Sequence, residues 1–160
     1  MSTHTISILT ENHSGSLSRI AGLFSSRGYN ISSLTVAETD DPTVARMTIV
    51  VSGEEGILEQ IVKQLNKLVD VIKVVDFKEE SIIERELILV RVDAAKSSRH
   101  EVIEIANLFL ARVAAVSAGS VTLELTGEKQ FVDDFIVMLK PYGIKEIVRS
   151  GAVAIARSRK

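Results

Sequence analysis

The 160-residue sequence contains no cysteine, no tryptophan and only two prolines, and aromatic residues make up 4% of it. The absence of cysteine excludes disulfide bonds, thiolate metal sites and a cysteine nucleophile. With so few aromatic side chains, the hydrophobic core must be mainly aliphatic. Charge of one sign is not in excess either, because 19 basic residues stand against 21 acidic ones and give a net charge of −2. A nucleic-acid protein that depends on a strongly basic face is therefore not expected.

Long hydrophobic runs are also absent. Charged residues interrupt every apolar stretch before the roughly 18 residues needed to cross a bilayer, although the mean hydropathy is +0.22. The first residues, Met1–His4, lack the basic flank and apolar segment of a secretion signal. Hydrophobic residues make up 46% and charged residues 25%, which is typical of globular proteins. We therefore expect a soluble, cytoplasmic protein with no membrane contact, built as one ordinary domain or two small ones.

The first half of the chain predicts the order strand, helix, strand, strand, helix, strand. Strands are expected over 4–10, 31–37, 44–51 and 71–77, where apolar residues alternate or β-branched residues cluster. The first helix carries an apolar stripe at helical spacing, and the second follows Ser52 and Glu55, which have the spacing of a capping box. Since right-handed crossovers place both helices on one face of the sheet, the pattern predicts a βαββαβ unit.

The second half repeats this pattern after a linker expected at 78–83. Strands are expected over 86–93, 112–117, 120–126 and 144–148, with a continuation of the last strand towards Ile155 left open, and helices lie between the first pair and the last pair. Residues 48–54 (TIVVSGE) and 122–128 (TLELTGE) match at an offset of 74. Ser98 and Glu101 suggest another capping box. The predicted fold class is α+β, with two tandem ferredoxin-like βαββαβ domains at 1–77 and 84–160.

No catalytic or metal-binding constellation emerges from the sequence. His4, His13 and His100 are scattered, without a spacing that suggests shared metal ligation. Neither a Walker loop nor a GxGxxG motif is present, and most carboxylates fall on predicted solvent faces or near helix caps. We therefore predict no catalytic residues and no metal site.

The loop 11–16 (ENHSGS), between the first strand and the first helix, is a candidate ligand site. The first turn of a helix has backbone N–H groups without internal partners and attracts anions. Gly15 lets the backbone approach a ligand closely, and Asn12 and Asn30 supply amide donors and acceptors. These features suit a small zwitterion with an aliphatic tail near Leu17, Ile31 or Leu34. Spacing alone nevertheless favours a structural role, with Gly15 as a turn and Ser14 or Ser16 as a helix cap.

Two other segments have less specific patterns. The equivalent loop of the second repeat, 93–98, has neither glycine nor asparagine, so we expect packing, oligomerisation or partner contact there rather than a second ligand site. Four basic residues near the C-terminus fit either a docking patch or a solvated tail, and the tail is the favoured interpretation. They are Arg149, Arg157, Arg159 and Lys160.

The run Leu9–Phe24 (LTENHSGSLSRIAGLF) strongly resembles the N-terminus of acetolactate (acetohydroxyacid) synthase small subunits. The likeness covers essentially the whole chain. Two departures are Ser16, where alanine or valine is commoner, and Ser32, where glutamate is commoner. Shorter segments with the same likeness are 27–31, 33–36, 39–42, 46–49, 60–61, 63–65, 67–71, 84–87, 124–127, 143–146 and 149–151.

This resemblance implies an N-terminal ACT domain, a C-terminal ferredoxin-like domain and a homodimer formed through the ACT domains. It implies that a feedback effector, usually valine, binds between the two ACT domains. One chain would contribute Asn12, Gly15, Ser16 and Leu17, and the other Asn30 and Ile31. Catalysis would take place in a separate large subunit that holds thiamine diphosphate, magnesium and FAD, and this chain would carry no cofactor. The chain would activate that subunit and make it sensitive to valine, in the biosynthesis of branched-chain amino acids.

Two other functions fit the same fold less well. An acylphosphatase-like hydrolase needs a phosphate-binding loop with an arginine, and the loop 11–16 has none. An RNA-binding module needs aromatic residues on its middle strands, where this chain has Thr48, Ile49 and Val50. The regulatory subunit is therefore the leading hypothesis.

Overall fold

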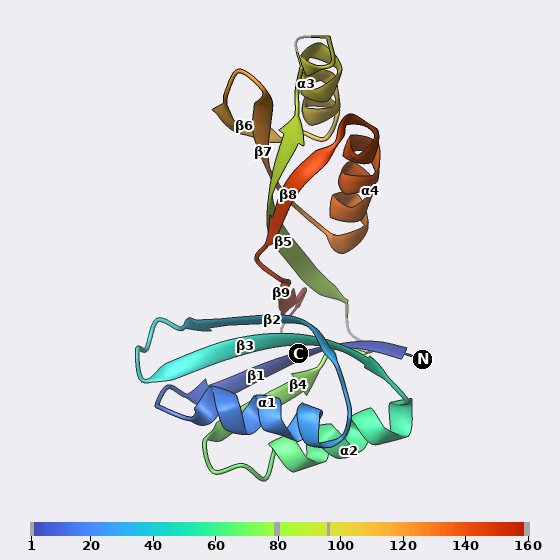
Figure 1. The fold of residues 1–160 in the computed structure, drawn as a ribbon. Coiled ribbons are helices and arrows are strands. Elements are labelled where there is room, and N and C mark those ends of the chain that lie inside the picture. The colour runs from blue at the N-terminus through green and yellow to red at the C-terminus, as the bar shows by residue number, and fades with distance from the viewer. Residues whose placement is uncertain (1, 79–80, 96, 159–160) are drawn as a thin grey trace. The chain divides into compact units, whose positions relative to one another are not determined.

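The computed structural model describes residues 2–78, 81–95 and 97–158, and the chain divides into two compact units (Figure 1). The first unit comprises Met1–Ile83 together with the C-terminal segment Ala152–Lys160. The second unit comprises Glu84–Gly151. The domain boundaries expected from the sequence stay a prediction, and residues 79–80 of the expected linker lie outside the described part.

The first unit is a four-stranded antiparallel sheet with two helices on one face (Figure 1). Its strand order is β2-β3-β1-β4, so β3 and β1 are central and β2 is an edge strand. The alternation expected for the first strand is confirmed, because Ile6 and Ile8 are buried with the core residues of both helices. The elements are β1 (Ser2–Glu11), α1 (Ser16–Ser26), β2 (Ile31–Glu38), β3 (Val44–Gly53), α2 (Glu55–Leu65) and β4 (Val71–Asp76).

The second unit repeats this topology with strand order β6-β7-β5-β8, and its helices also lie on one face of the sheet (Figure 1). Two tandem ferredoxin-like units are thereby confirmed. The first strand is longer than expected, since it begins at Ile82 within the expected linker. The elements are β5 (Ile82–Asp93), α3 (Arg99–Leu108), β6 (Arg112–Val116), β7 (Ser120–Gly127), α4 (Lys129–Leu139), the 3-10 turn η1 (Lys140–Tyr142) and β8 (Ile144–Arg149).

Both predicted capping boxes are wrong. Helix α2 is capped by Glu54 and α3 by Ser98, and neither residue makes a side-chain capping bond. Ser52 remains within β3, where its hydroxyl lies 3.0 Å from that of Thr3 on the neighbouring strand. The Ser98 hydroxyl donates to the carbonyl of Ala95 at 3.3 Å. Cross-strand and local turn bonds therefore compete successfully with the caps for these hydroxyl groups.

The last strand does not continue towards Ile155. Strand β8 ends at Arg149, and Gly151 turns the backbone with a φ of 84°. A separate short strand, β9 (Val153–Ala156), then pairs with β5. Glycine adopts such a left-handed conformation at little cost, so it can redirect the chain here.

The glycines of the internal repeat, Gly53 and Gly127, each lie under an aromatic ring. A β-carbon on Gly53 would lie 1.9 Å from Cε1 of Tyr29, and one on Gly127 would lie 2.6 Å from Cδ1 of Phe131. The repeated strand-Gly-Glu segment thus has the same packing arrangement in both units, with an aromatic ring against the glycine. A ring closes over the end of a central strand where only glycine leaves room for it.

Substituting either repeat glycine with alanine is expected to destabilise the protein by about 1–3 kcal/mol, because the ring must move to admit the new methyl group. The measurement is urea unfolding of Gly53→Ala and Gly127→Ala. The control is Gly22→Ala in the middle of α1, where no neighbouring atom lies within 4 Å of the new β-carbon. This variant should gain about 0.5–1 kcal/mol through helix propensity. Equal stability of all three variants would contradict the packing role.

Candidate functional site

The amino end of α1 offers unpaired backbone N–H groups, as expected. Gly15 precedes the helix with a φ of 88° and supplies no side-chain cap. The N–H of Ser16 donates to His13 O at 3.2 Å and that of Arg19 to Gly15 O at 3.0 Å. Within the described residues, no acceptor is found for the N–H groups of Leu17 and Ser18. Two donors at the positive end of the helix dipole are therefore left for an anion.

Asp70 holds the loop 11–16 from the side of β4. Its backbone carbonyl accepts hydrogen bonds from the N–H of Glu11 at 2.8 Å and from the hydroxyl of Thr10 at 3.0 Å. Its carboxylate accepts from the Ser16 hydroxyl at 3.4 Å and from Arg19 Nε at 2.8 Å. Asp70 and Ser16 are both buried, so these bonds fix the loop at two points.

Arg19 also lowers the pKa of Asp70. The hydrogen bond from the Arg19 guanidinium is the main reason why the pKa of the Asp70 carboxyl lies below its ordinary value of 3.8. The nearby His13 ring lies 3.6 Å from the other carboxylate oxygen. Glu11, His13 and Asp70 could offer metal ligands, with ligating atoms within 4.8 Å of one another. In this group, the Asp70 carboxylate is already paired with the positive charge of the Arg19 guanidinium.

Asn12 joins the loop to the far end of β2. Its side-chain amide donates to the carbonyl of Pro42 at 2.9 Å and to the carboxylate of Glu38 at 3.3 Å. Its backbone N–H donates to Thr43 O at 2.7 Å. The side chain is exposed, and its carbonyl oxygen has no partner among the described residues. Asn12 is therefore oriented but still has an acceptor for a ligand.

Asn30 and Ile31 lie at the opposite end of the sheet from this loop. Glu11 pairs with Val44 on β3, whereas Ile31 pairs with Val51, seven positions further along the same strand. At about 3.3 Å per residue, the two ends are roughly 23 Å apart. Within one chain, the structure thus brings Asn12, Gly15, Ser16 and Leu17 together and leaves Asn30 and Ile31 far from them. A single amino acid cannot touch both groups of one chain.

An apolar strip lies along the open edge of the first unit. Leu17 on α1 is 43% exposed, and Leu34 and Val36 on β2 are 37% and 40% exposed. The register places Leu34 opposite Ile49 and Val36 opposite Met47, so both point to the helix side of the sheet. Because β2 is an edge strand, one row of its backbone hydrogen-bonding groups also lies on this edge.

Sequence reasoning missed Arg19 and Asp70 as parts of the site. Arg19 lies three residues after Ser16, a spacing that places the two on neighbouring positions of one helix face and could have indicated the contact. Asp70 comes from the turn before β4, and no pattern in the sequence signals its position beside α1. Ser16 is buried against Asp70 rather than facing outward.

The fold and the helix-end site together define an ACT-domain protein. Residues 6–73 match the family model described as an AHAS small subunit-like ACT domain, and residues 85–158 match the model for the small subunit of acetolactate synthase. The chain belongs to the family of acetolactate synthase small subunits.

Similar proteins come from distant organisms. The chain is 49% identical to a probable acetolactate synthase small subunit of Archaeoglobus fulgidus over 98% of both chains. It is 51% identical to an acetolactate synthase small subunit of Haemophilus influenzae, over 97% of this chain and 96% of the relative. The crystal structure of a small subunit from Thermotoga maritima has 35% identity, full coverage of both chains and a TM-score of 0.89. The chain is thus a regulatory subunit whose partner is a catalytic large subunit. No helix among the described residues is long and apolar enough to span a membrane.

Removing the charge of Asp70 should give a stability loss that depends on pH. The pKa of Asp70 is lowered on folding. The ionised carboxylate therefore contributes to the free energy of unfolding above its ordinary pKa of 3.8, and this contribution is lost as the pH falls through the lowered pKa. The expected result is that the difference in unfolding midpoint between wild type and Asp70→Asn is constant between about pH 5 and 7 and shrinks below about pH 3.8. Since Arg19 is the main cause, the same comparison in an Arg19→Gln background should show little pH dependence. If the difference in unfolding midpoint between wild type and Asp70→Asn persisted unchanged to pH 3, this role would be ruled out.

Proposed function

We propose that this chain binds valine between the ACT units of two copies and thereby makes its catalytic partner sensitive to the end product of the pathway. In this proposal the chain activates the large subunit, which carries out the condensation of 2-keto acids with its own thiamine diphosphate, magnesium and FAD. The chain itself supplies recognition and no chemistry.

The separation of the two predicted groups of ligand residues supports a shared site. If β2 pairs antiparallel with β2 of a second copy, the start of each strand lies beside the end of the other. Strand β2 begins at Ile31, directly after Asn30, and ends at Glu38, which is bonded to Asn12 of the same chain. Such a pairing brings Asn30 and Ile31 of one copy towards the loop 11–16 of its partner. It also covers the exposed edge of β2.

The ligand chemistry at the loop suits a small amino acid. The N–H groups of Leu17 and Ser18 can donate to its carboxylate, and the side-chain oxygens of Asn12 and of the second copy's Asn30 can accept from its ammonium group. An aliphatic side chain can pack against Leu17 and Ile31. Burial of a valine-sized tail contributes about 1.5–3 kcal/mol, and the carboxylate at the helix end contributes about 0.3–2 kcal/mol. With the ammonium bonds, the expected Kd is roughly 10 μM to 1 mM.

Valine inhibits only to the extent that it binds two arrangements of the dimer unequally. A coupling of about 1–3 kcal/mol corresponds to a preference of about 5- to 150-fold for the inhibited arrangement. One methylene changes binding by only about 1–3 kcal/mol, so leucine and isoleucine are expected to compete with valine rather than to be excluded.

The direct test is calorimetric titration of the purified chain with valine, leucine and isoleucine, with alanine as control. We expect saturable binding of the branched-chain amino acids, with one ligand site for each loop 11–16 in the dimer. Alanine should bind more weakly. Sedimentation of the same sample should show a dimer. Absence of valine binding by a dimeric chain, alone and with the large subunit, would refute the proposal. Turnover of an acyl phosphate or a 2-keto acid by the isolated chain would favour an enzyme instead.

A further inference from the structure

The C-terminal segment Ala152–Arg157 is part of the first unit, although the whole second unit precedes it in the sequence. The N–H of Ala152 donates to the hydroxyl of Ser33 on β2 at 2.9 Å. At the other end, Arg157 donates to Ser81 through its backbone N–H at 2.9 Å and through Nε at 3.1 Å. These two anchors and the pairing of β9 with β5 hold this segment, which we name the return segment.

The return segment lies against the sheet face that the helices do not cover. The register places Ser7, Thr48 and Val50 on this face, and all three are buried. Within the described part of the first unit, no helix covers this face (Figure 1). Ala152 and Ala154 of the return segment are themselves buried, so they contribute to covering it.

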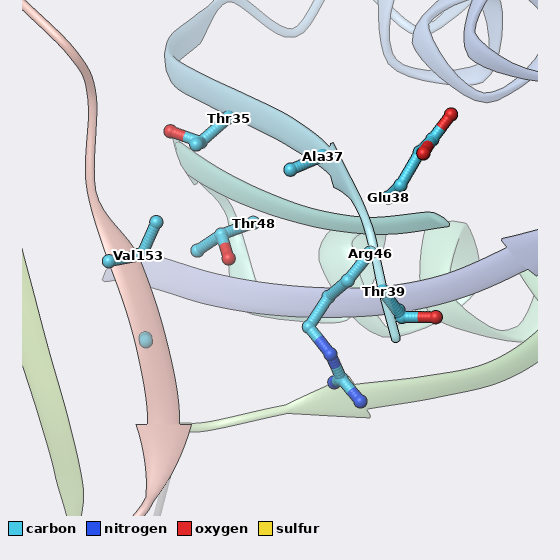
Figure 2. Close-up of a pocket in the computed structure, with 8 residues that line it drawn as sticks. Thr35, Ala37, Glu38, Thr39, Arg46, Thr48 and Val153 are labelled. Atoms are coloured by element: carbon cyan, nitrogen blue, oxygen red, sulfur yellow. The ribbon is translucent and has the colours of Figure 1, made fainter. Parts of the chain in front are cut away.

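The packing of the return segment is incomplete. A groove of about 290 Å³ remains between it and the sheet, and Figure 2 shows Val153 on one side and Thr35 and Thr48 on the other. Val153 and Ile155 are 50% and 65% exposed. Because half of the β9 side chains face solvent and a groove remains beneath the segment, we expect its local stability to be lower than that of the central strands.

The anchor residue Ser33 lies next to an irregularity in β2 that begins at a proposed ligand residue. The pairing of β2 with β3 shifts register between Ile31 and Ser33, and the Ser32 hydroxyl donates to the carbonyl of Val50 at 2.9 Å. Such bulges change the direction of neighbouring side chains and often lie beside functional sites. A ligand that fixes Asn30 and Ile31 therefore also fixes the backbone that carries Ser33.

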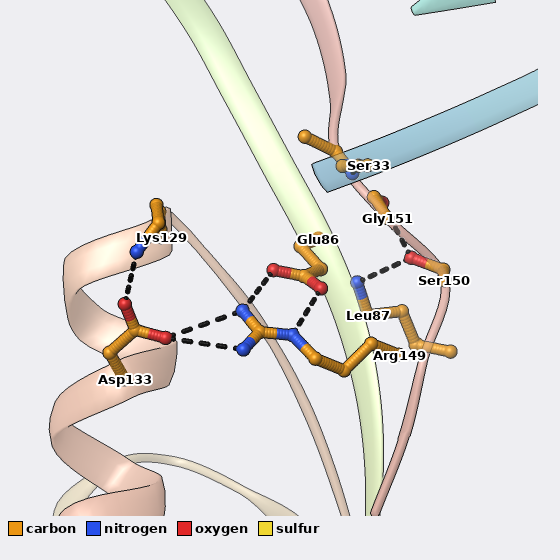
Figure 3. A network of polar contacts seen from close by, with 9 residues as sticks. Ser33, Glu86, Leu87, Lys129, Asp133, Arg149, Ser150 and Gly151 are labelled. Atoms are coloured by element: carbon orange, nitrogen blue, oxygen red, sulfur yellow. Dashed lines mark hydrogen bonds and ion pairs between the residues drawn. The ribbon is translucent and has the colours of Figure 1, made fainter. Parts of the chain in front are cut away.

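We propose that Ser33 is a positioning residue that couples the effector site to the return segment, so that bound valine holds this segment more firmly on the sheet. This inference depends on the proposed function. Ser150 and Gly151 connect the return segment directly to Arg149, whose guanidinium is bonded to Glu86 and Asp133 in the second unit (Figure 3). A change in the order of the return segment is thereby passed along the chain to the end of β8.

The test is hydrogen exchange of the full chain with and without saturating valine, read by mass spectrometry on peptides that cover 152–157. In wild type, valine should slow exchange in this segment about 3- to 10-fold. In Ser33→Ala this slowing should disappear, while valine still binds with an affinity reduced about 3- to 10-fold, since coupling is reciprocal. Ser117→Ala is the matched control, because it removes a hydroxyl that is bonded to Ser120 in a turn of the second unit, leaves the Ser33–Ala152 bond in place and should retain the slowing.

The outcomes separate the two proposals. Valine binding by wild type with unchanged exchange over 152–157 would overturn the coupling and leave the proposed function standing. Retention of the full slowing in Ser33→Ala would also overturn it. Failure of wild type to bind valine in calorimetry would refute the proposed function and the coupling that depends on it. Because Ser33 is partly exposed and its substitution removes only one hydroxyl, the variant is expected to fold.

Discussion

Replacing Gly15 with aspartate is expected to abolish valine inhibition of the assembled enzyme. The new carboxylate would lie at the start of α1, beside the Leu17 and Ser18 N–H groups that are proposed to bind the carboxylate of valine. It would occupy those donors and repel the ligand's negative charge. Together these effects should weaken binding by about 3 kcal/mol, which is more than about 100-fold. Inhibition curves of the reconstituted enzyme and calorimetry of the isolated chain measure this loss.

Gly15→Asn is the matched control for charge. Asparagine has the same shape as aspartate, and both tolerate the left-handed conformation that Gly15 adopts. In either variant the new β-carbon meets the Arg19 side chain, 3.0 Å from Nη1. Both variants should therefore show similar stability in thermal unfolding, but Gly15→Asn should keep measurable valine binding. If Gly15→Asp remained as sensitive to valine as wild type, the assignment of the site to the end of α1 would be wrong.

Most of the fold could be predicted from local pattern. Apolar residues at period two in β1 and at helical spacing in α1 specify both elements, and the hairpin turns at 39–42 and 118–119 lie where turn residues cluster. The recurrence of the segment around Gly53 at Gly127 predicts the duplicated unit from the sequence alone. Local signals succeed in these cases because each element buries one continuous face.

The candidate site was less predictable because its support is long-range. The backbone donors of α1 follow from where the helix begins, but the residue that fixes the loop, Asp70, is 54 residues away from Ser16. The failed capping boxes have a related cause. Ser52 has a cross-strand partner in Thr3, which a local motif cannot reveal.

Arg149 is the clearest case of a residue whose long-range partner could not be predicted from local sequence. The sequence favours a solvated basic tail, yet Arg149 ends β8 and makes two bonds of 2.7 Å to the carboxylate of Glu86, a buried residue of β5 (Figure 3). Asp133 adds a further contact at 3.3 Å and is itself bonded to Lys129. Arg157 is exposed but bonded to Ser81, and residues 159–160 lie outside the described part. For Arg149 the tail interpretation is therefore wrong, because a partner 63 residues earlier in the chain binds its guanidinium.

Truncation of Arg149 should consequently be one of the most destabilising changes in the second unit. In Arg149→Ala the Glu86 carboxylate would remain buried without its bidentate partner, and breaking a buried pair in this way costs about 3–5 kcal/mol. Because the Arg149 side chain is itself 39% exposed, we expect about 2–4 kcal/mol. Urea unfolding of the full chain measures this loss.

Arg91→Ala provides the matched comparison on the same pair of strands. Arg91 of β5 is bonded to Glu146 of β8 at 2.5 Å, but both side chains are about half exposed. Exposed ion pairs contribute only about 0–1 kcal/mol, since water solvates both charges when the pair is broken. The two arginine variants should therefore differ by at least about 1 kcal/mol, although each loses one guanidinium–carboxylate pair. If burial of Glu86 determines the strength of its pair, the double variant Arg149→Leu with Glu86→Leu should recover most of the stability that Arg149→Ala loses. Equal losses in Arg149→Ala and Arg91→Ala would mean that this burial is not decisive.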